Sequence, residues 1–413
     1  MSKTYCGACR GERGCRDCQA VGSSVQYAGL TDFFVQENNP KAYCDNMLYL
    51  AADLGTTTLA FVCVDACGEV LASYGCENPQ RRTAADVIGR IDASLHGQGE
   101  SLTNEIREAL IKGFLFVLTG GLEILRGRGF NSNGMRMRIG IAGNTVMQHL
   151  LLGYSPEGMA KAPFIPYSTQ MVVLAFSELF SQAMEAYEVP CILKRAEVTV
   201  FPCLSAFVGG DVVAGANAVF SKKKERVELL IDFGTNGEML LSVKGKWYGT
   251  AVAMGSAIEG GRYAYASDLF RKIAKALENG VLDETGLLCE PCFTEGYEGL
   301  LQEDVREFQL AKGAVRAGIE LLCRYAGVKP ERIYIAGGVG RYCEPEDLFR
   351  TGLLPKEFSG KVTLVGNSSI GGILSCLLKG EDMIYCEGES LNLAEQSEFE
   401  EMYYRFMNFE KEE

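Results

Sequence analysis

The chain has 413 residues, of which 47% are hydrophobic and 23% are charged, which suits a globular protein of about two or three domains. Lysine and arginine total 40 against 53 aspartates and glutamates, so the net charge of −13 argues against general binding to nucleic acid or to an anionic membrane. No apolar run reaches the ~18 residues of a membrane helix, and the polar first segment does not resemble a signal peptide. We therefore expect a cytoplasmic protein without nucleic-acid or membrane partners.

The 16 cysteines and two histidines limit the kinds of metal site and catalytic site that the chain could form. Most cysteines stand singly in apolar segments, where a thiol acts as a small hydrophobic side chain. This usage indicates a reducing compartment, and so many thiols would suit an anaerobic host. His96 and His149 are too few for a histidine-built zinc site or a Ser-His-Asp relay.

The first segment, residues 1–20, is the exception among the cysteine-bearing regions. It carries two close pairs in the spacing C-x2-C-x5-C-x2-C, namely Cys6, Cys9, Cys15 and Cys18. Four thiolates this close in sequence fit one tetrahedral metal ion or an iron–sulfur cluster. The gap between the pairs is shorter than in zinc ribbons, and the ferredoxin pattern C-x2-C-x2-C-x3-C-P is not matched, so spacing alone does not choose. Residues 21–47 are predicted to form a linker.

From residue 48 onward, short apolar runs alternate with helical patterns, which predicts an α/β fold. In the first half the pattern predicts strands at 48–53, 59–65 and 137–142 and helices at 86–94, 102–118 and 145–152. In the second half it predicts strands at 228–232, 238–243, 332–336 and 361–365, helices at 212–220 and 308–326, and a last helix starting near Ser369.

The two halves carry the same landmarks in the same order. LAADLGTTTLAFV in the first half matches LLIDFGTNGEMLL in the second, which places Asp53 and Asp232 179 positions apart. Further along, IGIAGNT matches IYIAGGV at an offset of 194 positions. Two matches at nearly equal offsets indicate a duplicated α/β domain, and we expect the domains at 48–205 and 206–413.

Each repeated hairpin has the residues of a phosphate and metal site. The aspartate ends a buried strand, the glycine allows a phosphate to come close, and the following hydroxyl, amide and backbone N–H groups form an anion-binding concavity. Mg²⁺ prefers one or two carboxylates with water and phosphate oxygens, so Asp53 and Asp232 are the expected metal ligands. The expected nucleotide-binding residues of the two hairpins are Gly55, Thr56, Thr57, Gly234, Thr235 and Asn236. An ordinary hairpin turn is the alternative for either copy taken alone.

Two further loops are candidate nucleotide contacts. Gly337 and Gly338 follow a predicted buried strand, where small residues let a flat ring such as adenine approach the backbone. Gly255 and Glu259 lie in the small-residue loop MGSAIEGG. The patterns G-x-G-x-x-G and G-x-x-x-x-G-K-S/T are absent, which argues against a dinucleotide-binding fold and a P-loop.

Asn144 and Asp211 each stand at the start of a predicted helix. Either side chain could orient the water that attacks a γ-phosphate, because phosphoryl transfer depends mainly on positioning and charge stabilisation. The alternative for both residues is a helix N-cap.

Taken in order, these motifs resemble the ATPase domain of the reductive activators of corrinoid proteins, a branch of the acetate kinase, sugar kinase and actin superfamily. The resemblance covers roughly residues 48–410 and also rests on NPQRRTAADVIGRI, AGNTVMQHLLLG, FVGGDVVAGANA, GSAIEGG, QLAKGAVRAGIELL and LNLAEQSEFEEMYYRFMNF. It implies two actin-like (ribonuclease H-like) domains with a nucleotide cleft between them, and ATP and Mg²⁺ as cofactors. It also implies an ATPase that drives low-potential electron transfer to an inactive Co(II) corrinoid on a partner protein, restoring Co(I).

The resemblance also bears on the N-terminal cysteines. Members of this family usually carry a ferredoxin-like domain with a [2Fe–2S] cluster, and the residues before position 48 are too few for one. We expect the four cysteines to hold a [4Fe–4S] cluster, because the implied function needs an electron carrier, with Zn²⁺ as the alternative. The implied partners are a corrinoid protein of a methyltransferase system and an electron donor that the sequence does not identify. A homodimer is compatible with this interpretation.

Two other functions fit the same fold. A small-molecule kinase of this superfamily would need a carboxylate base beside a sugar or acid pocket, and its N-terminal cysteines would have no role. An ATP-binding activator of another redox enzyme, such as a dehydratase, would favour a cluster that bridges two subunits. It would also lack the match that extends from residue 78 onward.

Overall fold

The computed structural model describes residues 46–129, 134–221, 225–234, 236–259, 262–263, 265–289, 298–339, 343–379 and 384–409. These residues form two compact units, which are described separately. The first contains the described residues up to Ala218 together with Asn367–Cys386, and the second contains Val219–Gly366 and the residues from Glu387 onward. From the sequence we expect the boundary between the two repeated domains near residue 206, and this boundary stays a prediction.

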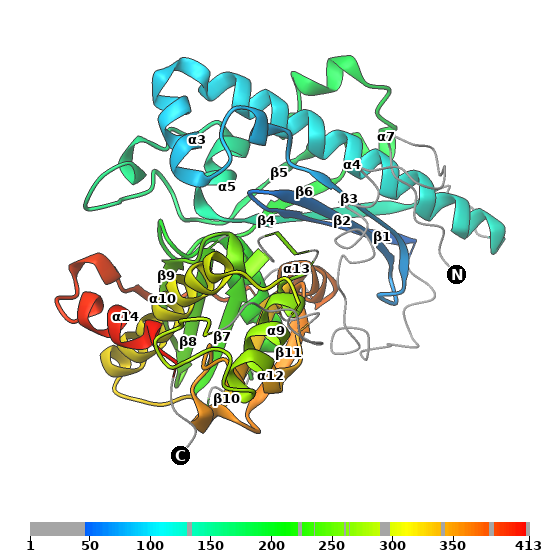
Figure 1. Ribbon diagram of the computed structural model, residues 1–413. Helices are drawn as coiled ribbons and strands as arrows, with labels where there is room; N and C mark the ends of the chain where they lie inside the picture. Colours follow the sequence, from blue (N-terminus) through cyan, green and yellow to red (C-terminus); the bar gives the residue numbers. More distant parts are fainter. Residues whose placement is uncertain are drawn as a thin grey trace. The chain divides into compact units, whose positions relative to one another are not determined.

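The first unit is built on a six-stranded sheet in the order β3-β2-β1-β4-β6-β5 (Figure 1). Its strands are β1 (Met47–Leu54), β2 (Thr58–Asp65), β3 (Val70–Glu77), β4 (Arg136–Gly143), β5 (Val172–Ala175) and β6 (Glu197–Val200). β1, β2 and β3 form an antiparallel meander, β1, β4 and β6 run parallel, and β5 pairs antiparallel with β6 at the edge. The central strand β1 therefore has neighbours on both sides, and Asp53 lies near its end.

Helices cover both faces of this sheet. They are α3 (Val87–Ala93), α4 (Gly99–Gly127), α5 (Thr145–Leu152), α6 (Phe176–Leu179), α7 (Cys191–Lys194), α8 (Gly210–Val219) and α13 (Ser368–Lys379). Leu50 and Ala52 of β1 belong to a core shared with α4 and α5, whereas Ala51 belongs to a second core shared with α8 and α13. Because successive strand residues point to opposite faces, the two cores lie on opposite sides of the sheet.

The second unit has a sheet in the order β11-β10-β7-β8-β9-β12. Its strands are β7 (Glu228–Phe233), β8 (Asn236–Val243), β9 (Lys246–Ala253), β10 (Arg332–Gly337), β11 (Val362–Gly366) and β12 (Gly388–Ser390), and its helices are α9 (Ala266–Glu278), α10 (Gln302–Ala326), α12 (Pro345–Arg350) and α14 (Phe399–Met407). β7, β8 and β9 form an antiparallel meander, while β7, β10 and β11 run parallel. β12 adds to the outer edge of β9.

The two sheets share one topology. The order β3-β2-β1-β4-β6 of the first unit corresponds strand by strand to β9-β8-β7-β10-β11 of the second, with the same parallel and antiparallel pairs. This correspondence confirms the predicted fold class, a duplicated actin-like α/β architecture.

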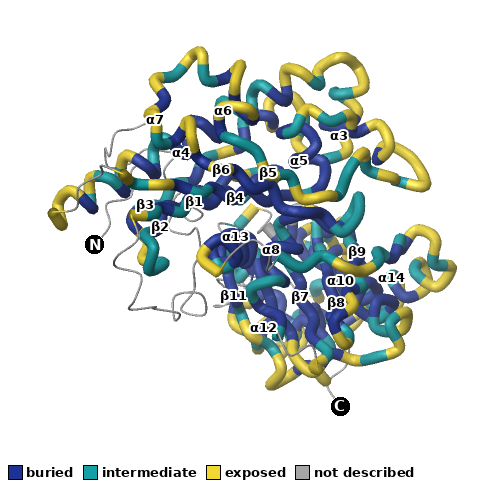
Figure 2. The backbone as a smooth tube through the Cα atoms, turned by 180° about the vertical axis from the view of Figure 1, so that it is seen from behind, coloured by how far each residue is buried: buried dark blue, intermediate teal, exposed yellow. Residues whose placement is uncertain are grey.

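Several strands could be predicted from the sequence because their residues are buried and therefore apolar. In β7, Leu229, Leu230 and Ile231 are all fully buried, as expected for a strand covered on both faces (Figure 2). Short helical turns connect the larger elements: η2 (Pro79–Arg82), η3 (Ser94–Gln98), η4 (Glu157–Met159), η5 (Ala183–Ala186), η6 (Ser256–Glu259), η7 (Lys356–Phe358) and η9 (Leu393–Glu395). Over the described part of the chain, every helix is too short or too polar to span a membrane.

Candidate functional site

Asp53, half-buried near the end of β1, is held by a residue from the far end of the chain. The side-chain amide of Asn367 donates to Asp53 Oδ2 at 2.8 Å, while Asn367 Oδ1 accepts the N–H of Ile370 at 2.8 Å. Burial raises the pKa of Asp53, and the hydrogen bond from Asn367 opposes that rise. Since Asn367 is fixed at both ends of its amide, it fixes the orientation of the Asp53 carboxylate.

Asp211 is the second carboxylate of this site. It lies in the first turn of α8, where Oδ1 accepts the N–H of Val212 at 2.8 Å. Burial, followed by the negative charge of Asp53, raises the pKa of Asp211 to about 7. The two carboxylates therefore repel one another, and a cation between them would relieve the repulsion.

This pair suits Mg²⁺ by the chemistry of its donors. In the residues that the structure describes, no group of three or more His, Cys, Asp or Glu side chains is placed to hold a metal ion. Mg²⁺ does not need such a cage, because it binds through one or two carboxylates and takes its other oxygens from phosphate and water. Asp53 and Asp211 thus fit a magnesium nucleotide better than a resident metal ion.

The carbonyl groups of the turn between β1 and β2 are all hydrogen-bonded. Asn78 Nδ2 donates to the carbonyl oxygen of Gly55 at 2.9 Å, and Arg90 Nη2 donates to that of Thr56 at 2.6 Å. The backbone N–H of Asn78 donates to the carbonyl oxygen of Thr57 at 2.9 Å. Each of these bonds holds a peptide plane of the turn, and because the peptide is planar it also fixes the direction of the next N–H, in residues 56–58. Fixed N–H groups in a tight turn are a feature of anion-binding loops.

Asn144 joins this turn to the start of α5. It is the N-cap of α5, accepting the N–H of Met147 at 3.0 Å, and its Nδ2 donates to Thr56 Oγ1 at 2.8 Å. A Cβ atom at Gly209 would lie 2.4 Å from the Cα of Asn144, so this close approach requires glycine. The N-cap that the sequence offered as an alternative is present at Asn144, whereas Asp211 lies inside its helix.

The second hairpin belongs to the second unit. Asp232 of β7 pairs in register with Glu238 of β8 and Ala336 of β10. Gly337 follows with φ +75°, and a Cβ atom there would lie 2.2 Å from the carbonyl oxygen of Phe233 and 2.8 Å from Asp232 Oδ1. Glycine is therefore needed at 337, and this residue lies directly against Asp232.

The structure describes some of the remaining predicted site residues and not others. The N–H of Gly234 donates to the carbonyl oxygen of Asn236 at 3.0 Å, and Gly338 has open space where a side chain would be. Gly255 has φ +67° and precedes η6. Thr235, the side chain of Glu259, and Cys6, Cys9, Cys15 and Cys18 lie outside the described part of the structure. Because Asp53 and Asp232 belong to different units, a metal site that they share stays a prediction.

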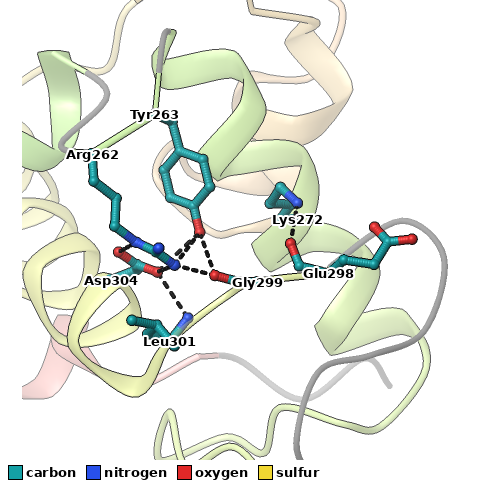
Figure 3. A network of polar contacts seen from close by, with 7 residues as sticks. All are labelled: Arg262, Tyr263, Lys272, Glu298, Gly299, Leu301 and Asp304. Atoms are coloured by element: carbon teal, nitrogen blue, oxygen red, sulfur yellow. Dashed lines mark hydrogen bonds and ion pairs between the residues drawn. The ribbon is translucent and has the colours of Figure 1, made fainter.

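A polar network anchors the chain just after the GSAIEGG loop (Figure 3). Asp304, near the start of α10, accepts from Arg262 Nε at 2.7 Å, from the Tyr263 hydroxyl at 2.9 Å and from the N–H of Leu301 at 2.8 Å. Arg262 also donates to the carbonyl oxygen of Gly299. Burial raises the pKa of Asp304, but these hydrogen bonds outweigh it and bring the pKa below its usual value.

Sequence reasoning missed two contributors to the first site, Arg90 and Asn367. It named Asn78 only as part of a polar segment, residues 78–82, that could line the cleft or form a solvated turn. A signal for Asn367 exists, because Gly-Asn follows a predicted strand and precedes a helix both at 143–144 and at 366–367. Asn78 and Arg90 lie in NPQRRTAADVIGRI, but no spacing rule connects that segment to the turn that they hold.

The duplicated fold and the carboxylate-lined turn define an ATPase domain of the actin-like class. The family model of the RACo middle region matches residues 48–223, and that of the C-terminal domain of RACo, the ASKHA domain, matches residues 226–268 and 298–413. The chain belongs to the RACo family.

Curated relatives and a solved structure agree with this assignment. Corrinoid activation enzyme RamQ of Eubacterium limosum is 26% identical over 426 residues, covering 86% of this chain and 69% of that protein. The reductase of the Co(II) methylated amine-specific corrinoid protein of Methanosarcina barkeri is 24% identical over 238 residues, covering 43% of this chain and 44% of that protein. The solved reductive activator for corrinoid, iron–sulfur protein has a TM-score of 0.73 at 22% identity over 89% of this chain, and thus shares the fold. This chain spans 66% of that structure's length.

Proposed function

We propose that this protein is an ATP-dependent reductive activator that returns an inactive Co(II) corrinoid protein to Co(I). The observation that carries the proposal is its membership of the RACo family, with both family models matched in order along the chain. The carboxylate pair Asp53 and Asp211 beside a phosphate-type turn supports the ATP-dependent part. The corrinoid-directed functions for which RamQ and the Methanosarcina reductase are named support the corrinoid part.

The residues of the first unit have separate roles in ATP hydrolysis. Asp53 and Asp211 hold Mg²⁺, which when bound offsets the negative charge of the phosphates. The N–H groups of the 55–57 turn bind phosphate oxygens, and Asn367 keeps Asp53 oriented. Asn144 and Asp211 orient the attacking water, since positioning accounts for most of phosphoryl-transfer catalysis.

The second hairpin, with Asp232, Gly234 and Asn236, is proposed as the second phosphate motif by its correspondence to the first. Gly337 ends β10 and Gly338 follows it, and the open space at Gly338 leaves room for the adenosine part of the nucleotide. Gly255 and Glu259 contribute from the loop that the Arg262 network anchors.

In the electron-transfer step one electron passes to Co(II) and produces Co(I). The four N-terminal cysteines would hold a [4Fe–4S] cluster, which when bound supplies an electron carrier between a low-potential donor and the corrinoid. ATP supplies the driving force by changing how the activator binds its corrinoid partner. This coupling separates the proposed function from that of a kinase, which would pass the phosphate to a metabolite.

The test combines the purified protein with a low-potential reductant, a Co(II) corrinoid protein and Mg-ATP under anaerobic conditions. The proposal expects the Co(I) absorption spectrum to appear with ATP and not with AMP or without nucleotide. Phosphorylation of a sugar or a carboxylic acid with no change at cobalt would assign the chain to the kinases instead. ATP hydrolysis that supports another redox enzyme, but not the corrinoid protein, would leave an activator with a different partner.

A further inference from the structure

Arg90 of α3 is a fully buried arginine. Its guanidinium donates to two backbone carbonyls, that of Thr56 at 2.6 Å and that of Ala84 at 3.3 Å. Its third contact is the sulfur of Met147 in α5, at 2.8 Å from Nη1. The side chain therefore connects the 55–57 turn with the segment before α3 and with α5.

This arginine keeps its charge without a carboxylate partner. Across the described ranges, no Asp or Glu side chain forms an ion pair with Arg90. Burial, and then the positive charge of Arg81, lower the pKa of Arg90 to about 10. Since that value is still well above 7, the guanidinium remains protonated at neutral pH. The negative charges of Asp86 and Glu105 oppose this lowering of the pKa. A buried cation without an ion-pair partner is costly, and an anion bound nearby would offset part of that cost.

Arg90 lies beside the turn that we propose as a phosphate site. The carbonyl groups of Gly55, Thr56 and Thr57 are bound by Asn78 and Arg90. A bound carbonyl holds its peptide plane, and with it the next N–H, in one orientation. A phosphate bound at this turn would gain from the fixed peptide groups and from the positive charge of Arg90.

We infer that Arg90 is a positioning residue for the phosphates of the nucleotide, holding the 55–57 turn in its anion-binding conformation without touching the ligand. This inference rests on the proposed nucleotide site of the first unit. It predicts that the benefit of Arg90 scales with the phosphate charge of the ligand. Adenosine, which lacks phosphate, should gain nothing from it.

The experiment measures the affinity of the full chain for ATP, ADP and adenosine by calorimetry, with Mg²⁺ present. Arg90→Met removes the charge and both carbonyl bonds, while Arg90→Lys keeps the charge and one donor group. The matched control is Arg107→Met, because Arg107 is half-buried and donates to the carbonyl oxygen of Leu151 at 3.0 Å, away from the turn. Each variant is checked by circular dichroism before titration.

For Arg90→Met we expect ATP binding about tenfold weaker or more, since hydrogen bonds from a charged donor are lost, with adenosine affinity unchanged. Arg90→Lys should recover part of the loss, and Arg107→Met should bind ATP as the wild type does. If Arg90→Met folds and loses ATP and adenosine affinity equally, or neither, Arg90 is only a structural residue and the inference is wrong. If Arg90→Met does not fold, Arg90→Lys is the test, because it keeps the charge but loses a carbonyl hydrogen bond and should lower the ratio of ATP affinity to adenosine affinity. A ratio equal to that of the wild type would overturn the inference. A wild-type protein that binds no ATP would refute the proposed function itself.

Discussion

The side-chain amide of Asn367 donates a hydrogen bond of 2.8 Å to the carboxylate of Asp53, 314 positions earlier in the chain. Asn367 comes directly after β11 of the second unit, at the point where the chain returns to the first unit and begins α13. It caps that helix with its oxygen and holds Asp53 with its nitrogen. One side chain thus links the orientation of a candidate catalytic carboxylate to the start of the returning helix.

Replacing Asn367 tests this link. Asn367→Ala should slow ATP hydrolysis by about tenfold, because Asp53 loses a donor that holds its carboxylate in place. The control is Asn392→Ala, which removes another asparagine N-cap, one that accepts the N–H of Ala394 at 3.1 Å, far from Asp53 in the sequence. Phosphate release at saturating ATP measures both. Equal turnover numbers for the two variants would show that the hydrogen bond has only a capping role.

The two hairpin aspartates are the next test. Asp53→Asn and Asp232→Asn should each retain the fold and slow ATP hydrolysis by roughly 100-fold or more. Asp53 is a proposed Mg²⁺ ligand and Asp232 is the corresponding carboxylate of the second phosphate motif, and losing such a charge costs several kcal/mol of transition-state stabilisation. Steady-state hydrolysis at several Mg²⁺ concentrations is the measurement. Normal hydrolysis by both variants would contradict the assignment of the nucleotide site.

Elements with a clear apolar pattern could be predicted from the sequence. The helix predicted at 145–152 has the same bounds in the structure, and the strand predicted at 59–65 begins one residue earlier. The helix predicted at 102–118 is much longer, Gly99–Gly127, and passes through Gly113 and Gly121. A Cβ atom would lie 2.3 Å from the ring of Phe61 at Gly113 and 2.8 Å from the sulfur of Cys63 at Gly121. Tertiary packing against β2 requires these glycines, and so outweighs their low helix propensity.

The candidate site was predictable only in part, for a different physical reason. Asp53 could be found because a repeated motif marks it locally. Asp211 was a candidate by itself, but its electrostatic interaction with Asp53, like the hydrogen bond from Asn367, depends on how α8 and α13 cover the sheet. The role of Arg90 could not be predicted from the sequence. Its guanidinium contacts backbone carbonyls, and because every residue has a carbonyl, no residue pattern marks these partners.

The raised pKa of Asp211 gives a prediction about stability and pH. The folded-state pKa of about 7 lies above the usual 3.8, so the folded protein binds the proton more tightly than the unfolded chain. Asp211 therefore destabilises the fold fully above about pH 7, and this cost disappears as the pH falls toward 4. Asp211→Asn should raise the melting temperature by a few degrees at pH 8 without Mg²⁺, and change it little at pH 4. Thermal unfolding in EDTA measures the difference, and an equal shift at both pH values would contradict it.

In the second unit, the network around Asp304 predicts the opposite dependence of folding stability on pH. Because its pKa is lowered in the folded state, Asp304 stabilises the fold above about pH 4, and that contribution is lost as the pH falls further. Asp304→Asn should cost about 1–3 kcal/mol at pH 7, a modest figure because the Arg262 partner is half exposed. Asp268→Asn, which removes the Arg271 partner of an exposed pair on α9, is the control and should cost about 0.5 kcal/mol or less. Denaturant unfolding at pH 7 and pH 3 tests both, and a loss for Asp304→Asn that persists at pH 3 would contradict the ionic origin.

The last prediction concerns the iron–sulfur cluster that we propose for the N-terminal cysteines. Anaerobic purification should yield about four iron and four sulfide per chain, and Cys9→Ser should lose most of both, because thiolates bind the cluster directly. Cys191→Ser removes an exposed single cysteine and should keep the iron. Arg10, Arg13 and Arg16 stand between the cysteines and would offset the negative charge of the cluster, raising its potential. Deleting residues 1–20 should abolish Co(I) formation and leave ATP binding intact, because the nucleotide residues all lie beyond position 48. One zinc per chain without iron, together with full activation by the deleted form, would exclude an electron-carrying role for this segment.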